Sequence, residues 1–233
     1  MTGSPQIGTL AETSLHAALK VWYGRPEDQF EVNVDGYVVD LVRAMDGDKW
    51  RLIEIQTGNF AAMKRKLARL LPVYPVTVVY PIAQEKWIVR ETAVGNSVSR
   101  RKSPKQGRLL DVFAELVHIA PLLPHPHLQL VVLLTQQEEV WRDDGLGSWR
   151  RRGWSIVDRR LLAVTAQERF AMPAALLALL PQTLAQPFTN RELAEAMNGQ
   201  MRLAQKITYT LAHCDVLAQV GKRGNAHLYR IYD

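Results

Sequence analysis

The sequence predicts an α/β fold, in which a mixed sheet flanked by helices is followed by a small helical domain with a terminal hairpin. Three observations predict it. Short apolar strands separated by tight turns fill residues 30–55, and a helical stretch separates them from a further apolar strand. The last sixty or so residues have helical periodicity until two short strands close the chain. We therefore expect two domains, at residues 1–165 and 166–233.

The elements of the first domain follow from local pattern. Asp35-Gly36 between alternating segments favours a tight hairpin, and a third strand after the next turn completes an antiparallel meander. A helix then connects to the next strand, which suits a crossover to a parallel position. The elements expected in order are a helix at 10–23, strands at 30–34, 37–42 and 49–55, a helix at 59–71 and a strand at 74–80.

Two of these strands carry an acid among apolar neighbours. Side chains at positions i and i+2 of a strand point to the same face, so Glu54 and Gln56 project together, away from Ile53 and Ile55. Asp40 ends an equally apolar strand. A strand rarely buries a carboxylate without a partner or a metal. Because adjacent antiparallel strands can bring Asp40 beside Glu54, the pattern predicts a divalent-metal site on the sheet.

This order of elements, together with the Glu-x-Gln strand, resembles the PD-(D/E)XK nuclease superfamily, and within it the archaeal Holliday-junction resolvases. The resemblance covers roughly residues 10–90 and implies a restriction-endonuclease-like fold. It makes Glu12 the acid of the first helix, Asp40 the aspartate of the second strand and Glu54 the acid of the (D/E)-x-K pair. Gln56 stands where that motif has lysine. We expect Lys64 of the following helix to fill this role and Lys66 to point elsewhere.

The resemblance implies a DNA endonuclease that hydrolyses phosphodiester bonds with Mg²⁺ or Mn²⁺. Asp40, Glu54 and the carbonyl oxygen of Ile55 would be the metal ligands, since Mg²⁺ prefers oxygen. Glu12 would add a metal or water contact, and Gln56 with Lys64 would position water and phosphate. The alternative is a non-catalytic DNA-binding protein or regulator with an inactivated nuclease fold, because glutamine supplies no charge.

Each of these residues also has a simpler interpretation. A single acid in a strand commonly faces solvent on a half-exposed sheet. Glu12 lies three residues after Thr9, a spacing that is typical of a helix cap. The basic residues of the helix at 59–71 would by default form a solvated face. These residues are Lys64, Arg65, Lys66 and Arg69.

A second pattern occupies the C-terminus. An apolar helix at 171–180 precedes a capping box, Thr189-Asn190-Arg191-Glu192, which opens a second helix. A third helix at 201–213 leads to a hairpin at 216–231, and the whole resembles a winged helix-turn-helix domain. That fold implies DNA binding, although winged helices also serve protein contacts. The side chains expected to face DNA are Arg202, Gln205, Lys206 and Tyr209 on the third helix and Lys222 and Arg223 at the hairpin tip.

Between these segments, we expect a basic mobile loop at 96–108, a helix at 109–119 and a buried strand at 128–135. A formal charge of +6 favours polyanionic partners. One cysteine, Cys214, excludes an internal disulfide and is expected to be a buried apolar residue. No secretory leader or membrane-length apolar run is apparent. We therefore expect a cytoplasmic, DNA-binding protein without membrane contact, and the sequence leaves a homodimer open.

Overall fold

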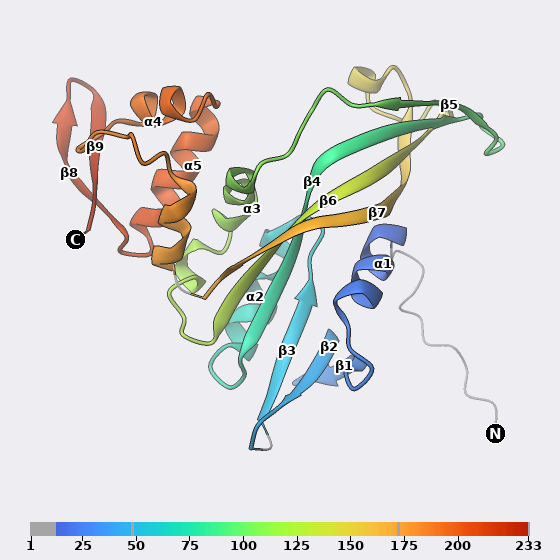
Figure 1. Ribbon diagram of the computed structural model, residues 1–233, viewed down its shortest axis with the longest axis horizontal. Coiled ribbons are helices and arrows are strands. Elements are labelled where there is room, and N and C mark those ends of the chain that lie inside the picture. Colours follow the sequence, from blue (N-terminus) through green and yellow to red (C-terminus); the bar gives the residue numbers. More distant parts are fainter. Residues whose placement is uncertain (1–12, 48, 172, 233) are drawn as a thin grey trace. The chain divides into compact units, whose positions relative to one another are not determined.

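The computed structural model describes residues 13–47, 49–171 and 173–232 (Figure 1). The chain is a mixed α/β protein with a central mixed sheet and flanking helices, so the coarse fold class is confirmed. It forms two compact units. The first unit comprises residues 1–26, 83–107 and 134–166, and the second comprises 27–82, 108–133 and 167–233.

The second unit begins with the expected meander. Strands β1 (Gln29–Val34), β2 (Tyr37–Met45) and β3 (Lys49–Ile55) pair antiparallel in that order. Helix α2 (Phe60–Leu70) then crosses over to β4 (Val76–Glu91), which pairs with β3 in parallel. The meander and the parallel crossover are therefore confirmed, while β4 runs well beyond the expected residue 80.

Helix α2 lies on the face of the sheet that carries Glu54. The residues that it buries recur at helical spacing, and the Phe60 ring meets the Tyr80 ring edge-on at 5.1 Å. Glu54 pairs with Val78 in the parallel register, so Tyr80, two residues later, shares its face. The backbone N–H of Phe60 donates to Oε2 of Glu115 at 2.9 Å, which satisfies an otherwise open helix end. The buried stripe is Phe60, Met63, Leu67 and Leu70.

The sheet continues with long strands that pass from one unit into the other. β6 (Leu128–Arg142) follows β4 in the strand order, and β7 (Ser155–Phe170) follows β6. β5 (Ser97–Lys102) pairs with the distal part of β4, so the expected mobile loop at 96–108 is wrong for these six residues. The reason is pairing across strands: Arg100 and Lys102 form ion pairs with Glu138 and Glu85.

Two expected helices differ from their predicted form. Helix α1 (Ser14–Tyr23) starts after Thr13, whose hydroxyl caps it, and the expected cap with Glu12 lies outside the described residues. The helix expected at 109–119 is divided into η1 (Leu109–Val112) and α3 (Phe113–Leu116), followed by η2 (Ala120–Leu122). Pro121, which has no N–H, stands in η2 and cannot extend the α-helical ladder.

The C-terminal segment has the expected order of elements. Helix α4 (Asn190–Ala196) opens with the Thr189–Glu192 capping box, and α5 (Met201–Ala212) follows it. Strands β8 (Leu217–Arg223) and β9 (Ala226–Ile231) form the closing hairpin. The first element, η4 (Pro173–Leu179), is a 3₁₀ helix where we expected an α-helix. Phe188 additionally forms a bridge with Tyr229 of β9.

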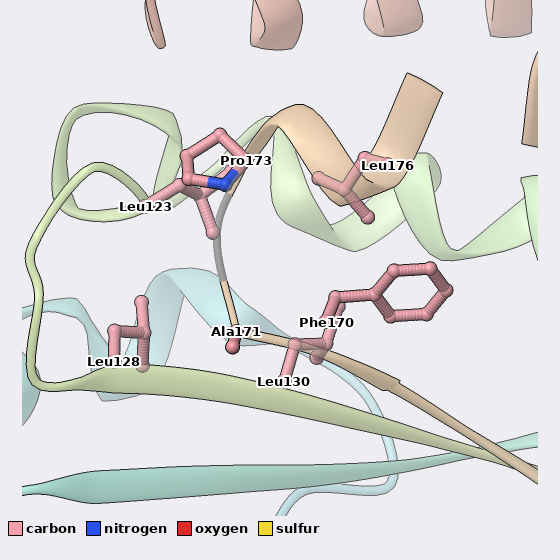
Figure 2. A pocket seen from close by; sticks show the side chains of 7 residues that line it. All are labelled: Leu123, Leu128, Leu130, Phe170, Ala171, Pro173 and Leu176. Atoms are coloured by element: carbon pink, nitrogen blue, oxygen red, sulfur yellow. The ribbon is translucent and has the colours of Figure 1, made fainter. Parts of the chain in front are cut away.

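Figure 2 shows how η4 joins the sheet within the second unit. Side chains from η4 and from the end of β7 surround a space beside the start of β6. Its volume of about 20 Å³ is room for about one water, and its lining is apolar, so we interpret it as a packing gap and not as a ligand site. The lining residues are Leu123, Leu128, Leu130, Phe170, Ala171, Pro173 and Leu176.

Cys214 is buried, as expected. Burial, together with the neighbouring Asp215 carboxylate, raises the pKa of its thiol to about 12. Within the described residues, no helix combines the length and the apolar character that are needed to cross a bilayer.

Candidate active site

The structure brings Asp40 and Glu54 together. The β2–β3 register pairs Leu41 with Ile53, and its continuation by one residue sets Asp40 opposite Glu54. The backbone N–H of Ile55 donates to Oδ2 of Asp40 at 2.8 Å. Glu54 is 5% exposed, whereas Asp40 is half-buried. Two carboxylates therefore share one face of the sheet where β3 ends.

Lys66 of α2 is the cation that reaches this pair of acids. Its Nζ lies 2.5 Å from Oε1 of Glu54 and also donates to the carbonyl oxygen of Val38 at 2.5 Å. The expectation that Lys66 points elsewhere is therefore wrong. Lys64 and Lys66 border the apolar stripe of α2 on opposite edges, because successive helical residues are about 100° apart. The edge with Lys66 faces β2 and β3, and Lys64 is exposed.

A pocket of about 530 Å³ opens beside Glu54. Arg65 reaches it from α2 and Tyr37 from β2, so a second cation lies at the site that sequence reasoning treated as part of a solvated face. The side-chain amide of Gln56 also lines the pocket but folds back to donate to the carbonyl oxygen of Gly58. The complete lining is Tyr37, Glu54, Gln56, Ala62, Met63, Arg65 and Lys66.

The oxygen atoms at this site meet some of the requirements of a hard divalent cation. Asp40 and Glu54 provide carboxylate oxygens on adjacent strands, the ligands that Mg²⁺ prefers. A metal ion at this site would either share the Glu54 carboxylate with Lys66 or displace the Lys66 ammonium from it. Over the described ranges of the chain, no group of three or more His, Cys, Asp or Glu residues is placed to hold a metal. Glu12, the third acid expected here, lies outside those ranges.

Helix α5 exposes most of the side chains that we expected on it. Arg202, Gln205 and Tyr209 are exposed, and the Tyr209 ring stacks on His213 with 4.0 Å between centroids. Lys206 differs: its ammonium donates to the carbonyl oxygen of Ala114 at 2.7 Å. It stands at the edge of the exposed stripe where α5 packs against α3, and this packing directs the side chain to α3.

The hairpin tip carries the two remaining expected cations. Lys222 and Arg223 are both exposed at the end of β8. Nη1 of Arg223 lies 2.6 Å from Oε1 of Glu192, in the first turn of α4. A hydrogen bond from the Thr189 backbone N–H, followed by the Arg223 contact, lowers the pKa of Glu192 below its usual value. The hairpin is thereby tied to the helix pair through one exposed ion pair.

A comparison of the sequence with known protein families gives a match that covers most of the chain. The profile described as "Domain of unknown function (DUF8091)" matches residues 13–171. The chain belongs to the DUF8091 family. The matched region contains β2, β3 and α2, and ends before α4 and α5.

The chain is also similar to a protein of Treponema pallidum (strain Nichols) that carries the description "Uncharacterized protein". The two are 33% identical over 225 residues, which cover 96% of this DUF8091 chain and 87% of the Treponema protein. The similarity therefore extends beyond residue 171, into the C-terminal segment that the family profile does not match. No solved structure shows significant similarity to the chain.

Proposed function

We propose that this DUF8091 protein is a divalent-metal-dependent DNA endonuclease with a restriction-endonuclease-like core and a winged helix that binds DNA. One observation carries the proposal. Asp40 and Glu54 lie opposite each other on antiparallel β2 and β3, and the helix of the following parallel crossover supplies a lysine to Glu54. This is the arrangement of acids and cation that the nuclease resemblance implies, with Lys66 in place of Lys64.

The residues of the site have separable roles in this proposal. Asp40, Glu54 and the Ile55 carbonyl would hold Mg²⁺ or Mn²⁺, which when bound lowers the pKa of a water and offsets phosphate charge. Lys66 and Arg65 place positive charge beside the position of a scissile phosphate. Gln56 orients the loop before α2 through its bond to Gly58 and offers no charge.

The C-terminal elements support a DNA substrate. A 3₁₀ helix, a bridge at Phe188, helices α4 and α5 and the β8–β9 hairpin follow one another in the order of a winged helix. Arg202, Gln205 and Tyr209 would face the major groove, and Lys222 and Arg223 would contact phosphates. Lys206 is left out of this surface because it binds α3.

A second candidate function is a DNA-binding regulator whose nuclease fold does not cleave. The observation that favours it is the Lys66–Glu54 ion pair itself. A buried pair of this kind can serve structure alone, by tying α2 to β2 and β3. The absence of the motif lysine at Gln56 points the same way.

Nicking of supercoiled DNA in Mg²⁺, Mn²⁺ or EDTA tests the proposal. Wild-type protein is expected to nick in at least one metal, while Asp40→Asn and Glu54→Gln abolish nicking and retain DNA affinity. Mn²⁺ binding by calorimetry should weaken in both variants. Lys66→Gln is expected to lose nicking by about a hundredfold, the usual scale for one electrostatic contact to the transition state. Lys64→Gln, on the opposite edge of α2, is the matched control.

Gln56→Lys is expected to keep or raise activity, because it adds a cation beside the phosphate. Wild-type protein that binds DNA but cleaves no supercoiled, branched or single-stranded form with either metal would overturn the nuclease proposal in favour of the regulator. Equal nicking by Lys66→Gln and wild type would remove Lys66 from the mechanism.

A further inference from the structure

The loop between β6 and β7, residues 143–154, exposes two large apolar side chains. Leu146 is 86% exposed and Trp149 is 83% exposed. We call this segment, which lies within the first unit, the Trp149 loop. Tryptophan is seldom so accessible on a folded protein, and it is the residue most typical of binding hot spots. The proposed nuclease site uses neither residue.

The backbone of the Trp149 loop is held in place by its own hydrogen bonds. The Asp144 carboxylate accepts from the N–H of Leu146 at 3.0 Å and from the Ser155 hydroxyl at 2.5 Å. The N–H of Gly147 donates to the carbonyl of Gly153 at 2.9 Å, which closes the loop. A Cβ on Gly147 would stand 1.9 Å from the Trp154 carbonyl oxygen, so only glycine fits there.

This closed frame means that Leu146 and Trp149 are presented from a fixed backbone. A preorganised loop loses little conformational freedom when it binds, so its exposed side chains can contribute more of their contact energy to affinity.

The segment that follows Trp149 is basic. Three arginines, residues 150–152, follow Trp149 directly in the sequence. Arg152 is exposed, and Nε of Arg151 donates to the Trp154 carbonyl at 3.0 Å, which orients that guanidinium at the loop. An aromatic ring next to arginines is the combination that binds single-stranded nucleic acid, in which bases stack on the ring and cations contact the backbone.

We propose that the Trp149 loop is a nucleic-acid contact that recognises unpaired bases. Trp149 stacks on an exposed base, Leu146 flanks it, and Arg152 contacts a phosphate. The choice of nucleic acid as ligand rests on the proposed function, which it deepens: the substrate is DNA with accessible base faces, such as a fork, a branch or a single strand. A blunt duplex offers such faces only at its ends.

An anionic membrane is a less suitable partner for the same chemistry. Interfacial binding scales with the apolar area that enters the bilayer, and here two side chains are separated by Gly147 and Ser148. Stacking on a base, by contrast, needs only one exposed ring.

Binding in EDTA, where no metal-dependent cleavage occurs, tests the proposal on the full chain. The probes are fluorescein-labelled oligo(dT), a forked duplex and a blunt duplex. Trp149→Ala is expected to weaken binding to oligo(dT) and to the fork by about tenfold and to the blunt duplex by much less. Trp149→Phe should retain most of the affinity, because it keeps a stacking ring. Trp22→Ala is the matched control, since Trp22 is also exposed in the first unit.

Arg152→Ala should lower the slope of log affinity against log salt by about 0.7 for oligo(dT). Unchanged oligo(dT) and fork affinity in Trp149→Ala, with a thermal midpoint equal to wild type, would overturn the proposal. Binding of Trp149→Ala to phosphatidylserine vesicles is measured as well. If this variant lost affinity for the vesicles and kept its affinity for oligo(dT) and the fork, the proposal would be overturned in favour of a membrane. These experiments measure binding and not cleavage. Their result therefore tests the Trp149 loop even if the protein proves not to be a nuclease.

Discussion

Two ion pairs of the second unit have the same chemistry and opposite surroundings. In the Lys66–Glu54 pair the side chains are 16% and 7% exposed, and in the Arg223–Glu192 pair they are 60% and 40% exposed. The nitrogen–oxygen distances are nearly equal, at 2.5 and 2.6 Å. The environment, and not the distance, therefore decides what each pair does for stability and for binding.

The difference in exposure determines how easily each ion pair can be broken. Removal of Lys66 would leave a buried carboxylate without its cation, which a folded protein tolerates poorly. Arg223 can leave Glu192 for another anion at little cost, because water screens both groups. The buried pair thus suits a preorganised reaction centre, and the exposed pair suits reversible contact with phosphate.

The largest expected effect comes from breaking the buried pair. Lys66→Met should lower the free energy of unfolding by about 3 kcal/mol, because Glu54 stays buried after its ion pair with Lys66 is removed. Lys64→Met, on the exposed edge of the same helix, should change it by less than about 0.5 kcal/mol. Urea denaturation followed by circular dichroism measures both.

The double variant Glu54→Gln/Lys66→Met removes both charges and should recover much of this loss. If Lys66→Met alone costs no more than Lys64→Met, the contrast between the two pairs is wrong.

Much of the fold could be predicted because local pattern and topology agree. Asp35-Gly36 specifies the hairpin, and the antiparallel register that follows sets Asp40 opposite Glu54. The apolar stripe of α2 indicates which residues pack on the sheet. The capping box at Thr189 likewise marks the start of α4.

Side-chain partners could not be predicted, because they depend on how elements rotate against each other. Lys64 and Lys66 flank the stripe of α2 symmetrically, and only the packed structure shows which edge faces Glu54. The position of Lys206 along α5 predicts that it shares the face expected to contact DNA. In the structure its ammonium instead donates to a backbone carbonyl of α3. The basic segment at 97–102 forms a strand because it pairs with the distal part of β4, and Glu85 of β4 and Glu138 of β6 offset its charge.

An intermediate effect is expected at the helix cap that holds Glu192. The Thr189 hydroxyl accepts from the N–H of Glu192, and the Thr189 N–H donates to the Glu192 carboxylate at 2.7 Å. Thr189→Ala removes the hydroxyl and should cost about 1 kcal/mol, the usual value for a helix cap. Thermal unfolding measures it, with Thr183→Ala, at an exposed turn position, as the control. A loss as large as that of Lys66→Met would show that the capping site is as critical as the buried pair.

The smallest effect on stability is expected at the exposed pair. Arg223→Ala should lower the free energy of unfolding by at most about 1 kcal/mol, and less in high salt. Hydrogen bonding from Thr189 and the contact with Arg223 hold the pKa of Glu192 below its ordinary value of 4.5. The folded state therefore binds this proton less readily than the unfolded chain. The stabilisation is present above that value and is lost as pH falls below it.

Glu192→Gln should abolish this acid dependence and release Arg223. If the hairpin binds phosphate, the same variant should tighten DNA binding at neutral pH, since Arg223 no longer has a competing carboxylate. Glu195→Gln, an exposed acid on the same helix, removes an equal charge without touching Arg223 and serves as the control. Equal gains in affinity from both variants would assign the effect to net charge alone. An unchanged affinity in Glu192→Gln would remove Arg223 from the DNA contact.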